Sequence, residues 1–215
     1  MDVGARNPED VARLGIKPGD FITVPKKYRK LLGRKASGRA LDDRVGCTAL
    51  ISAVWALGAT EPKLPGRDIT FVWSTREELG LFGAAGAAKN MAEAGKTPTY
   101  VFAVDTFVSA DSPLESKRFG DAQVGRGFVV RAIDNSNIVP RKLVEKVVSI
   151  AHANNIPAQY GVTGGGNDGS AFLIYGTTDV ALGWPLRYSH SPAEVVDVRD
   201  VDALGKIIAA LARSW

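Results

Sequence analysis

Residues 127–162 read GFVVRAIDNSNIVPRKLVEKVVSIAHANNIPAQYGV, and this stretch decides the fold. The almost unbroken apolar run at 127–133 predicts a buried strand, and residues 158–162 predict another. Between them, residues 140–153 place apolar side chains at helical intervals and begin with a proline, which predicts a helix. A helix between two buried strands is typical of a parallel sheet that is covered by helices.

The same alternation extends to both sides of this stretch. We expect buried strands at 69–74, 99–104 and 180–184. We also expect three helices: one that begins near Val45, one at 81–94 and one at 201–211. The sequence therefore predicts an α/β fold with a mixed, mostly parallel sheet flanked by helices.

The first residues of the chain have a different pattern. A short helix at 8–14, a turn at 17–20 and a short strand at 21–24 are predicted, and none of them has the length of a strand–helix–strand unit. We expect residues 1–38 to be the remnant of a small β-rich domain and residues 39–215 to form the α/β domain.

The composition excludes several classes of protein. Hydrophobic residues make up 45% of the 215 residues and charged residues 23%, which is typical of a globular domain and not of a disordered chain. No apolar run approaches the roughly 20 residues of a membrane-spanning helix, so we expect no membrane partner. One cysteine and no basic–apolar leader at the N-terminus predict a cytoplasmic protein.

Positive charge is concentrated in residues 26–39, which hold seven lysines and arginines and no acidic residue. A nucleic-acid-binding surface usually interleaves aromatic side chains with basic ones, and only Tyr28 does so here. We therefore expect a solvated loop and no nucleic-acid partner. Nucleic-acid binding through this segment stays open as an alternative, which predicts strongly salt-dependent affinity.

Acidic residues and one histidine follow the apolar runs. Asp42 and Asp43 precede a helix, Glu77 and Glu78 follow the 69–74 strand, Asp105 ends the 99–104 strand, and His190 follows the 180–184 strand. Taken one at a time, these residues have simpler explanations: an aspartate before a helix is often an N-cap, and one at a strand end is often a turn residue. If they converge at one edge of the sheet, they can hold a divalent cation such as zinc.

Five motifs that follow one another along the chain resemble those of the M42 family of co-catalytic zinc aminopeptidases, the tetrahedral aminopeptidases. They are RALDDRVG at 39–46, STREELGLFGA at 74–84, VD at 104–105, GGGND at 164–168 and RYSHSPAEVVDVRD at 187–200. The opening residues resemble the end of that family's inserted dimerisation domain. The resemblance implies peptide substrates and a homo-oligomer.

The resemblance also implies a role for each candidate residue. Asp42 would bridge two metal ions, and the Asp42–Asp43 peptide would be cis. Glu78 and His190 would complete one metal site, Asp105 would bind the other metal, and Glu77 would be the general base.

One ligand of the family is missing from this sequence. The family takes a second histidine from a His-x-Asp segment before the bridging aspartate, whereas this chain has no histidine before Asp42, and its other histidine, His152, is expected at the surface. We therefore expect one tight site for zinc or cobalt and a weak second site. The chain resembles the C-terminal part of a longer enzyme, and the alternatives are a non-catalytic scaffold or half of a split enzyme.

The glycine-rich segment GGGNDG at 164–169 formally matches a dinucleotide-binding fingerprint. That fingerprint also requires an acidic residue about 20 positions further on, at the end of a second strand, and Asp179 is too close and precedes its strand. We instead expect a loop that lines the substrate pocket, with Asp168 close to the substrate.

Overall fold

The computed structural model describes residues 2–25, 27–60, 66–113 and 122–215. Its main sheet has the strand order β4-β8-β5-β6, made of Val104–Val108, Leu182–Leu186, Phe128–Ile133 and Ala158–Val162. β4 is parallel to β8 and β5 is parallel to β6, while β5 and β8 are antiparallel. The predicted mixed α/β class is confirmed.

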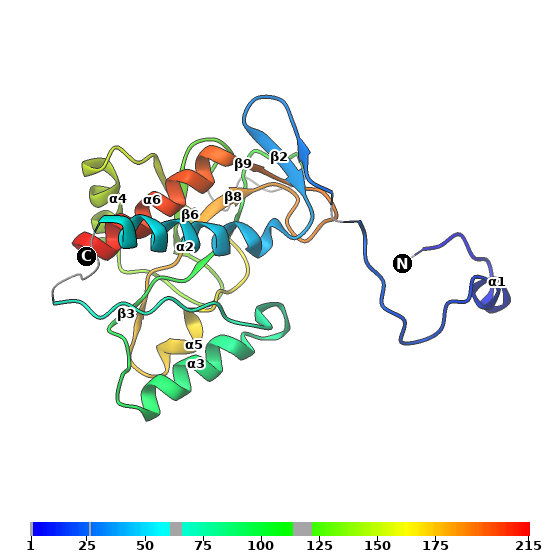
Figure 1. The fold of residues 1–215 in the computed structure, drawn as a ribbon, viewed down its shortest axis with the longest axis horizontal. Coiled ribbons are helices and arrows are strands. Elements are labelled where there is room, and N and C mark those ends of the chain that lie inside the picture. The colour runs from blue at the N-terminus through cyan, green and yellow to red at the C-terminus, as the bar shows by residue number, and fades with distance from the viewer. Residues whose placement is uncertain (1, 26, 61–65, 114–121) are drawn as a thin grey trace.

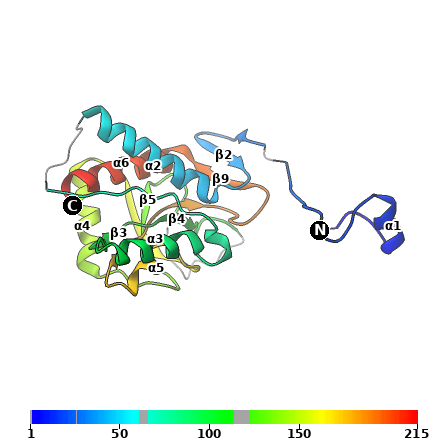
Figure 2. The same ribbon diagram turned by 60° about the horizontal axis from the view of Figure 1, so that its bottom comes forward.

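Helices cover both faces of this sheet (Figure 1). On one face lie α2 (Leu41–Thr60), α4 (Arg141–Ala153) and α6 (Val198–Ser214), whose buried side chains form one large core with β5 and β8. On the other face, α3 (Phe82–Glu93) packs against α5 (Ser170–Leu173) in a smaller cluster, and Figure 2 shows the two layers edge-on. In the large core, side chains such as Trp184, Leu204 and Ile207 are fully buried, and each contributes about 1.5–3 kcal/mol to the stability.

A two-stranded ladder continues the main sheet. β3 (Tyr100–Val101) pairs in parallel with β7 (Thr178–Asp179). The strand predicted at 99–104 is therefore interrupted at residues 102–103, and of the strand predicted at 180–184 only residues 182–184 belong to a strand, β8. The hydrogen bonds from Val180 N to Val101 O and from Leu182 N to Ala103 O, both 2.8 Å, carry the ladder across the interruption.

The basic segment is a hairpin and not the predicted loop. β1 (Arg29–Lys30) pairs with β2 (Lys35–Gly38), and β2 pairs with β9 (Glu194–Asp197), all antiparallel. The turn is possible because Gly33 adopts a φ of 70°, which glycine tolerates without a steric cost. The hairpin thus depends on a strand far along the chain, which local composition does not reveal.

Two predicted strands are wrong. Residues 69–74 are extended but belong to no ladder among the described residues, and Ile69, Val72 and Trp73 are 40%, 39% and 46% exposed. Residues 21–24 also form no strand, and Phe21 is fully exposed. β-branched and aromatic residues favour the extended backbone, but a strand also needs a neighbour that satisfies its backbone groups.

The N-terminal region contains the helix α1 (Pro8–Arg13), which lies apart from the α/β body in both views (Figures 1 and 2). Asn7 caps this helix through its side chain, which accepts a hydrogen bond from Asp10 N at 2.8 Å. In the part of the chain that is described, we find no helix with the length and hydropathy needed to cross a membrane.

Candidate metal centre

Three of the predicted ligands meet in space. Asp42 lies at the start of α2, Glu78 in the short 3-10 helix η1 (Glu77–Leu79), and His190 in the loop between β8 and β9. Nε2 of His190 is 3.2 Å from Oδ2 of Asp42 and 3.5 Å from Oε2 of Glu78. One ligand atom from each residue lies within 4.8 Å of the others, which is close enough for all three to contact one cation.

The beginning of α2 separates the roles of its two aspartates. Both residues have non-helical backbone angles, and the peptide bond between them is cis, as the sequence analysis expected. The Asp43 side chain accepts a hydrogen bond from Gly46 N at 2.9 Å, so Asp43 is the residue that caps the helix. Asp42 is left to face His190.

Unusual backbone conformations surround this cluster. Among the described residues, six non-glycine residues have a positive φ, and all but Asn155 lie next to the candidate site: Ala40, Arg76, Leu81, Tyr188 and His190. Such conformations cost free energy and persist only where the surrounding contacts enforce them. The local backbone is therefore shaped to present these side chains.

The cluster is strongly acidic. Burial, followed by the charges of Asp105 and Glu78, raises the pKa of Asp42 to about 6. Burial and the charge of Asp105 also raise the pKa of Asp43 to about 9. Carboxylates that repel one another in this way are stabilised by a bound cation.

Glu77 differs from its neighbour Glu78. It is half-buried, whereas the side chain of Glu78 is 60% exposed and faces His190. Burial, followed by the charges of Asp105 and Asp168, raises the pKa of Glu77 to about 7. A carboxylate with this pKa is suited to accept and return a proton near neutral pH.

Asp105 lies near the cluster but is engaged by another partner. It is the second residue of β4 and does not end a strand, which corrects the sequence-based placement. Oδ2 of Asp105 is 3.0 Å from Nη1 of Arg131, and Oδ1 accepts a hydrogen bond from Thr106 N at 2.6 Å. Burial raises the pKa of Asp105, and the Arg131 guanidinium opposes this effect.

Asp168 lies in the glycine-rich loop between β6 and α5. It accepts a hydrogen bond from the hydroxyl of Ser74, and its other oxygen is buried without a hydrogen-bond partner among the described residues. Burial raises its pKa, and its charge contributes to the raised pKa of Glu77. Asp168 therefore belongs to the same acidic region.

Two buried charged residues beside the cluster, Arg131 and Glu194, are not among the residues predicted from the sequence. Arg131 bridges Asp105 and Asp134 at 3.0 and 3.2 Å and donates to the carbonyl of Gly166. For Arg131 the signal is a single charge within an apolar strand, since such a charge must find a buried partner. Glu194 begins a strand that also ends in an acidic residue, Asp197, so the sequence carries no such signal for it.

The donor set fits a divalent cation of intermediate hardness. The cluster offers one imidazole and two carboxylates from three different segments, which is the number of protein ligands in a catalytic zinc site. Such a site leaves a fourth coordination position open. The same ligand types also suit cobalt.

Comparisons with known proteins agree with the resemblance seen in the motifs. A model of the family described as M42 glutamyl aminopeptidase matches residues 1–207. A lysyl aminopeptidase of Pyrococcus furiosus is 31% identical over 216 residues, which cover 98% of this chain and 58% of that protein.

Solved structures show the same fold. The TET1 peptidase of Pyrococcus horikoshii is 40% identical with a TM-score of 0.80, and the match covers 100% of this chain and 60% of that one. The aminopeptidase APDkam598 of Desulfurococcus kamchatkensis is 30% identical with a TM-score of 0.81, covering 100% of this chain and 59% of that one. The chain thus spans about 60% of the length of these relatives. Since the family model covers nearly the whole chain, the protein belongs to the M42 peptidase family.

Proposed function

We propose that this chain is a metal-dependent aminopeptidase that removes the N-terminal residue of peptides. The observation that carries the proposal is the cluster of Asp42, Glu78 and His190, whose ligand atoms converge on one point. Its relatives include a lysyl aminopeptidase, so peptide bonds are the substrate class that fits.

In the proposed reaction, Asp42, Glu78 and His190 would hold one zinc or cobalt ion. Such an ion supplies a Lewis acid that makes a neighbouring water more acidic. Glu77 accepts the proton of the attacking water and returns it to the leaving amine, a role that its raised pKa supports. Asp168 would lie close to the substrate, and the acidic region would attract the positively charged N-terminus of a peptide.

We propose that a second metal ion binds weakly at the carboxylate of Asp105. That carboxylate already contacts Arg131 and Thr106, and the sequence has only two histidines, of which His152 lies exposed in the last turn of α4.

We further propose a homo-oligomer in the cytoplasm. The TET1 peptidase of P. horikoshii assembles into a tetrahedron or an octahedral shell, and a single cysteine suits a reducing compartment.

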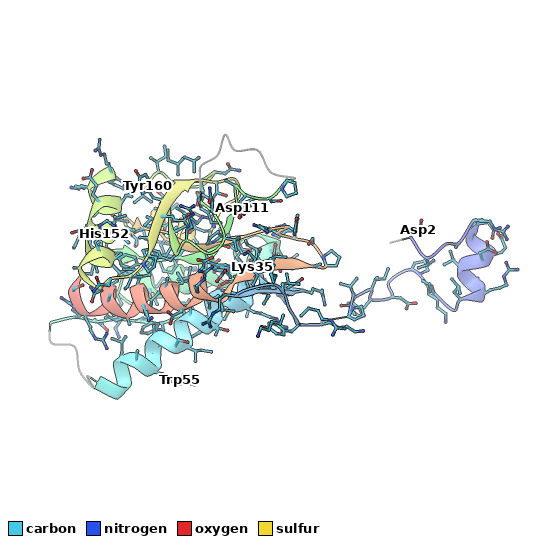
Figure 3. All side chains as sticks on the ribbon, turned by 90° about the horizontal axis from the view of Figure 1, so that it is seen from above. Asp2, Lys35, Trp55, Asp111, His152 and Tyr160 are labelled. Atoms are coloured by element: carbon cyan, nitrogen blue, oxygen red, sulfur yellow. The ribbon has the colours of Figure 1, made fainter. Side chains whose placement is uncertain are left out.

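A second candidate function is that of one component of a two-part enzyme. It is favoured by exposed apolar side chains on α2 and at residues 69–73. On α2, Trp55 is 73% exposed and points away from the body (Figure 3). The extended backbone at 69–73 can pair with a strand of another polypeptide, which would also supply the missing imidazole.

Metal titration with an activity assay tests these proposals. We expect calorimetry to show about one tight Zn²⁺ or Co²⁺ per chain, and aminoacyl-anilides to be hydrolysed only after metal is added. No metal retained at micromolar concentrations would contradict the aminopeptidase proposal. A chain that binds metal but gains turnover only with a second polypeptide, equivalent to the part of the relatives outside this match, would support the two-part enzyme.

A further inference from the structure

Glu194 is a buried acidic residue that the proposed reaction does not use. It is the first residue of β9, it is 2% exposed, and no lysine or arginine lies within salt-bridge distance of it among the described residues. A buried carboxylate without a cation requires several hydrogen-bond donors, and the donors found here are all backbone N–H groups.

Those donors belong to the two segments that carry the candidate ligands. Oε2 of Glu194 accepts hydrogen bonds from Leu41 N at 2.6 Å and from Asp42 N at 3.4 Å. Oε1 accepts a hydrogen bond from His190 N at 3.1 Å. A single carboxylate therefore ties the start of α2 to the loop of His190, across 153 residues of sequence between Leu41 and Glu194.

These contacts also explain how the strained backbone is held. His190 has a φ of 60° and Ala40, which precedes Leu41, has a φ of 57°. A left-handed conformation at a non-glycine residue persists where nearby groups over-determine it, and the Glu194 carboxylate contacts the backbone at or beside both residues.

We infer that Glu194 is a positioning residue for the metal site, which sets the distance between Asp42 and His190 by holding the backbone of both. This inference rests on the proposed metal-binding function. Groups that orient metal ligands from behind typically change metal affinity 10- to 100-fold when they are altered. Glu194 differs from the usual partner of a ligand because it acts on the main chain and not on the imidazole or carboxylate itself.

The test compares Glu194→Gln with Asp197→Asn in the full chain. Both residues are buried carboxylates of β9, but Asp197 bonds to Arg199 and not to the segments of the candidate ligands. The glutamine keeps the size of the side chain but replaces one acceptor oxygen with an amide group that donates, so one of the two segments loses its anchor. We expect Zn²⁺ affinity, measured by competition with a chromogenic chelator, to fall 10- to 100-fold in Glu194→Gln and to stay within twofold in Asp197→Asn.

Two further measurements separate positioning from a general loss of stability. We expect the visible absorption spectrum of the Co²⁺-loaded protein to change in Glu194→Gln, and we expect Glu194→Gln to have little additional effect on Zn²⁺ affinity in a His190→Ala background. Unchanged Zn²⁺ affinity and an unchanged Co²⁺ spectrum would overturn the inference even if the melting temperature falls.

The outcome for the unaltered chain distinguishes the two proposals. If that chain binds no Zn²⁺, the proposed function fails; if it binds Zn²⁺ and Glu194→Gln binds equally well, only the positioning role fails. Should Glu194→Gln not fold, Glu194→Asp keeps the charge with a shorter reach, and an unaltered Zn²⁺ affinity in that variant overturns the inference in the same way.

Discussion

Glu77 and Glu78 are neighbours in the chain with different surroundings, and this difference assigns their chemistry. Glu78 points at His190, whereas Glu77 is half-buried among other carboxylates that help to raise its pKa to about 7. Adjacent acids whose environments differ can divide the tasks of ligand and proton acceptor.

Glu77→Gln tests this division of roles. The amide cannot accept a proton, so we expect kcat to fall 10²- to 10⁴-fold while Zn²⁺ affinity stays close to that of the unaltered chain. Glu78→Gln is the matched control, for which we expect weaker Zn²⁺ binding because a ligand loses its charge. Steady-state kinetics and calorimetry measure both. Full activity of Glu77→Gln would remove it from the role of general base.

The pKa of Asp42 leads to a prediction about pH. A carboxylate must lose its proton to bind a metal, and burial together with Asp105 and Glu78 raises the pKa of Asp42 to about 6. Below that pH, protons compete with the metal for Asp42, so Zn²⁺ affinity should rise by at least about tenfold per pH unit between pH 4 and 6, because His190 must also be neutral to bind. Calorimetry in buffers of different ionisation enthalpy would also detect the released proton. A pH-independent affinity would show that Asp42 is not a ligand.

At the scale of the elements, α3 is held closely against the segment that carries the two glutamates. Gly83 N donates to Thr75 O at 2.8 Å, and a Cβ at Gly83 would lie 2.3 Å from Thr75 N. Only glycine permits this approach, and it sets the position of η1 relative to α3.

Two glycines of α3 provide a matched pair of variants. Gly83→Ala should push α3 away from Thr75, with a loss of about 1–3 kcal/mol of unfolding free energy and weaker metal binding. Gly86→Ala meets no atom within 4 Å and should stabilise the protein by about 0.5–1 kcal/mol, because alanine is the better helix former. Urea denaturation of both variants checks this. Equal effects at the two positions would mean that the contact with Thr75 does not limit the packing.

At the scale of the whole molecule, tryptophans lie both in the core and at the surface. Trp184 is fully buried in β8, whereas Trp55, on the same helix as the exposed Ile51 and Val54, is 73% exposed and Trp73 is 46% exposed. An exposed apolar patch of this kind marks a site of association.

The tryptophans distinguish stability from association. Trp55→Lys with Trp73→Lys should reduce self-association or binding of a second polypeptide. Trp55 is the more exposed of the two, and Trp55→Lys alone should change the unfolding free energy by at most about 0.5 kcal/mol. Trp184→Ala should cost about 3–5 kcal/mol because it opens a cavity in the core. Denaturation and sedimentation velocity measure the two effects. Unaltered association in the double variant would show that this surface is not an interface.

The sequence by itself determined the α/β class, the α4 and β6 segments and three candidate metal ligands. α4 was expected at 140–153 and spans Arg141–Ala153, because its apolar periodicity is long and a proline marks its start. The resemblance to the M42 family implies Asp42, Glu78 and His190 as ligands of one metal ion, and the structure brings one ligand atom of each within 4.8 Å of the others.

Only the tertiary structure decided which groups surround that cluster and which apolar segments find a partner. Residues 69–74 have the composition of a strand but no ladder partner among the described residues, whereas the basic segment became a hairpin because β9 pairs with it. The Arg131–Asp105 pair and the contacts of Glu194 likewise join residues distant in sequence. Local preferences fix the backbone of a segment, but its hydrogen-bond and charge partners depend on which distant segments the fold places beside it.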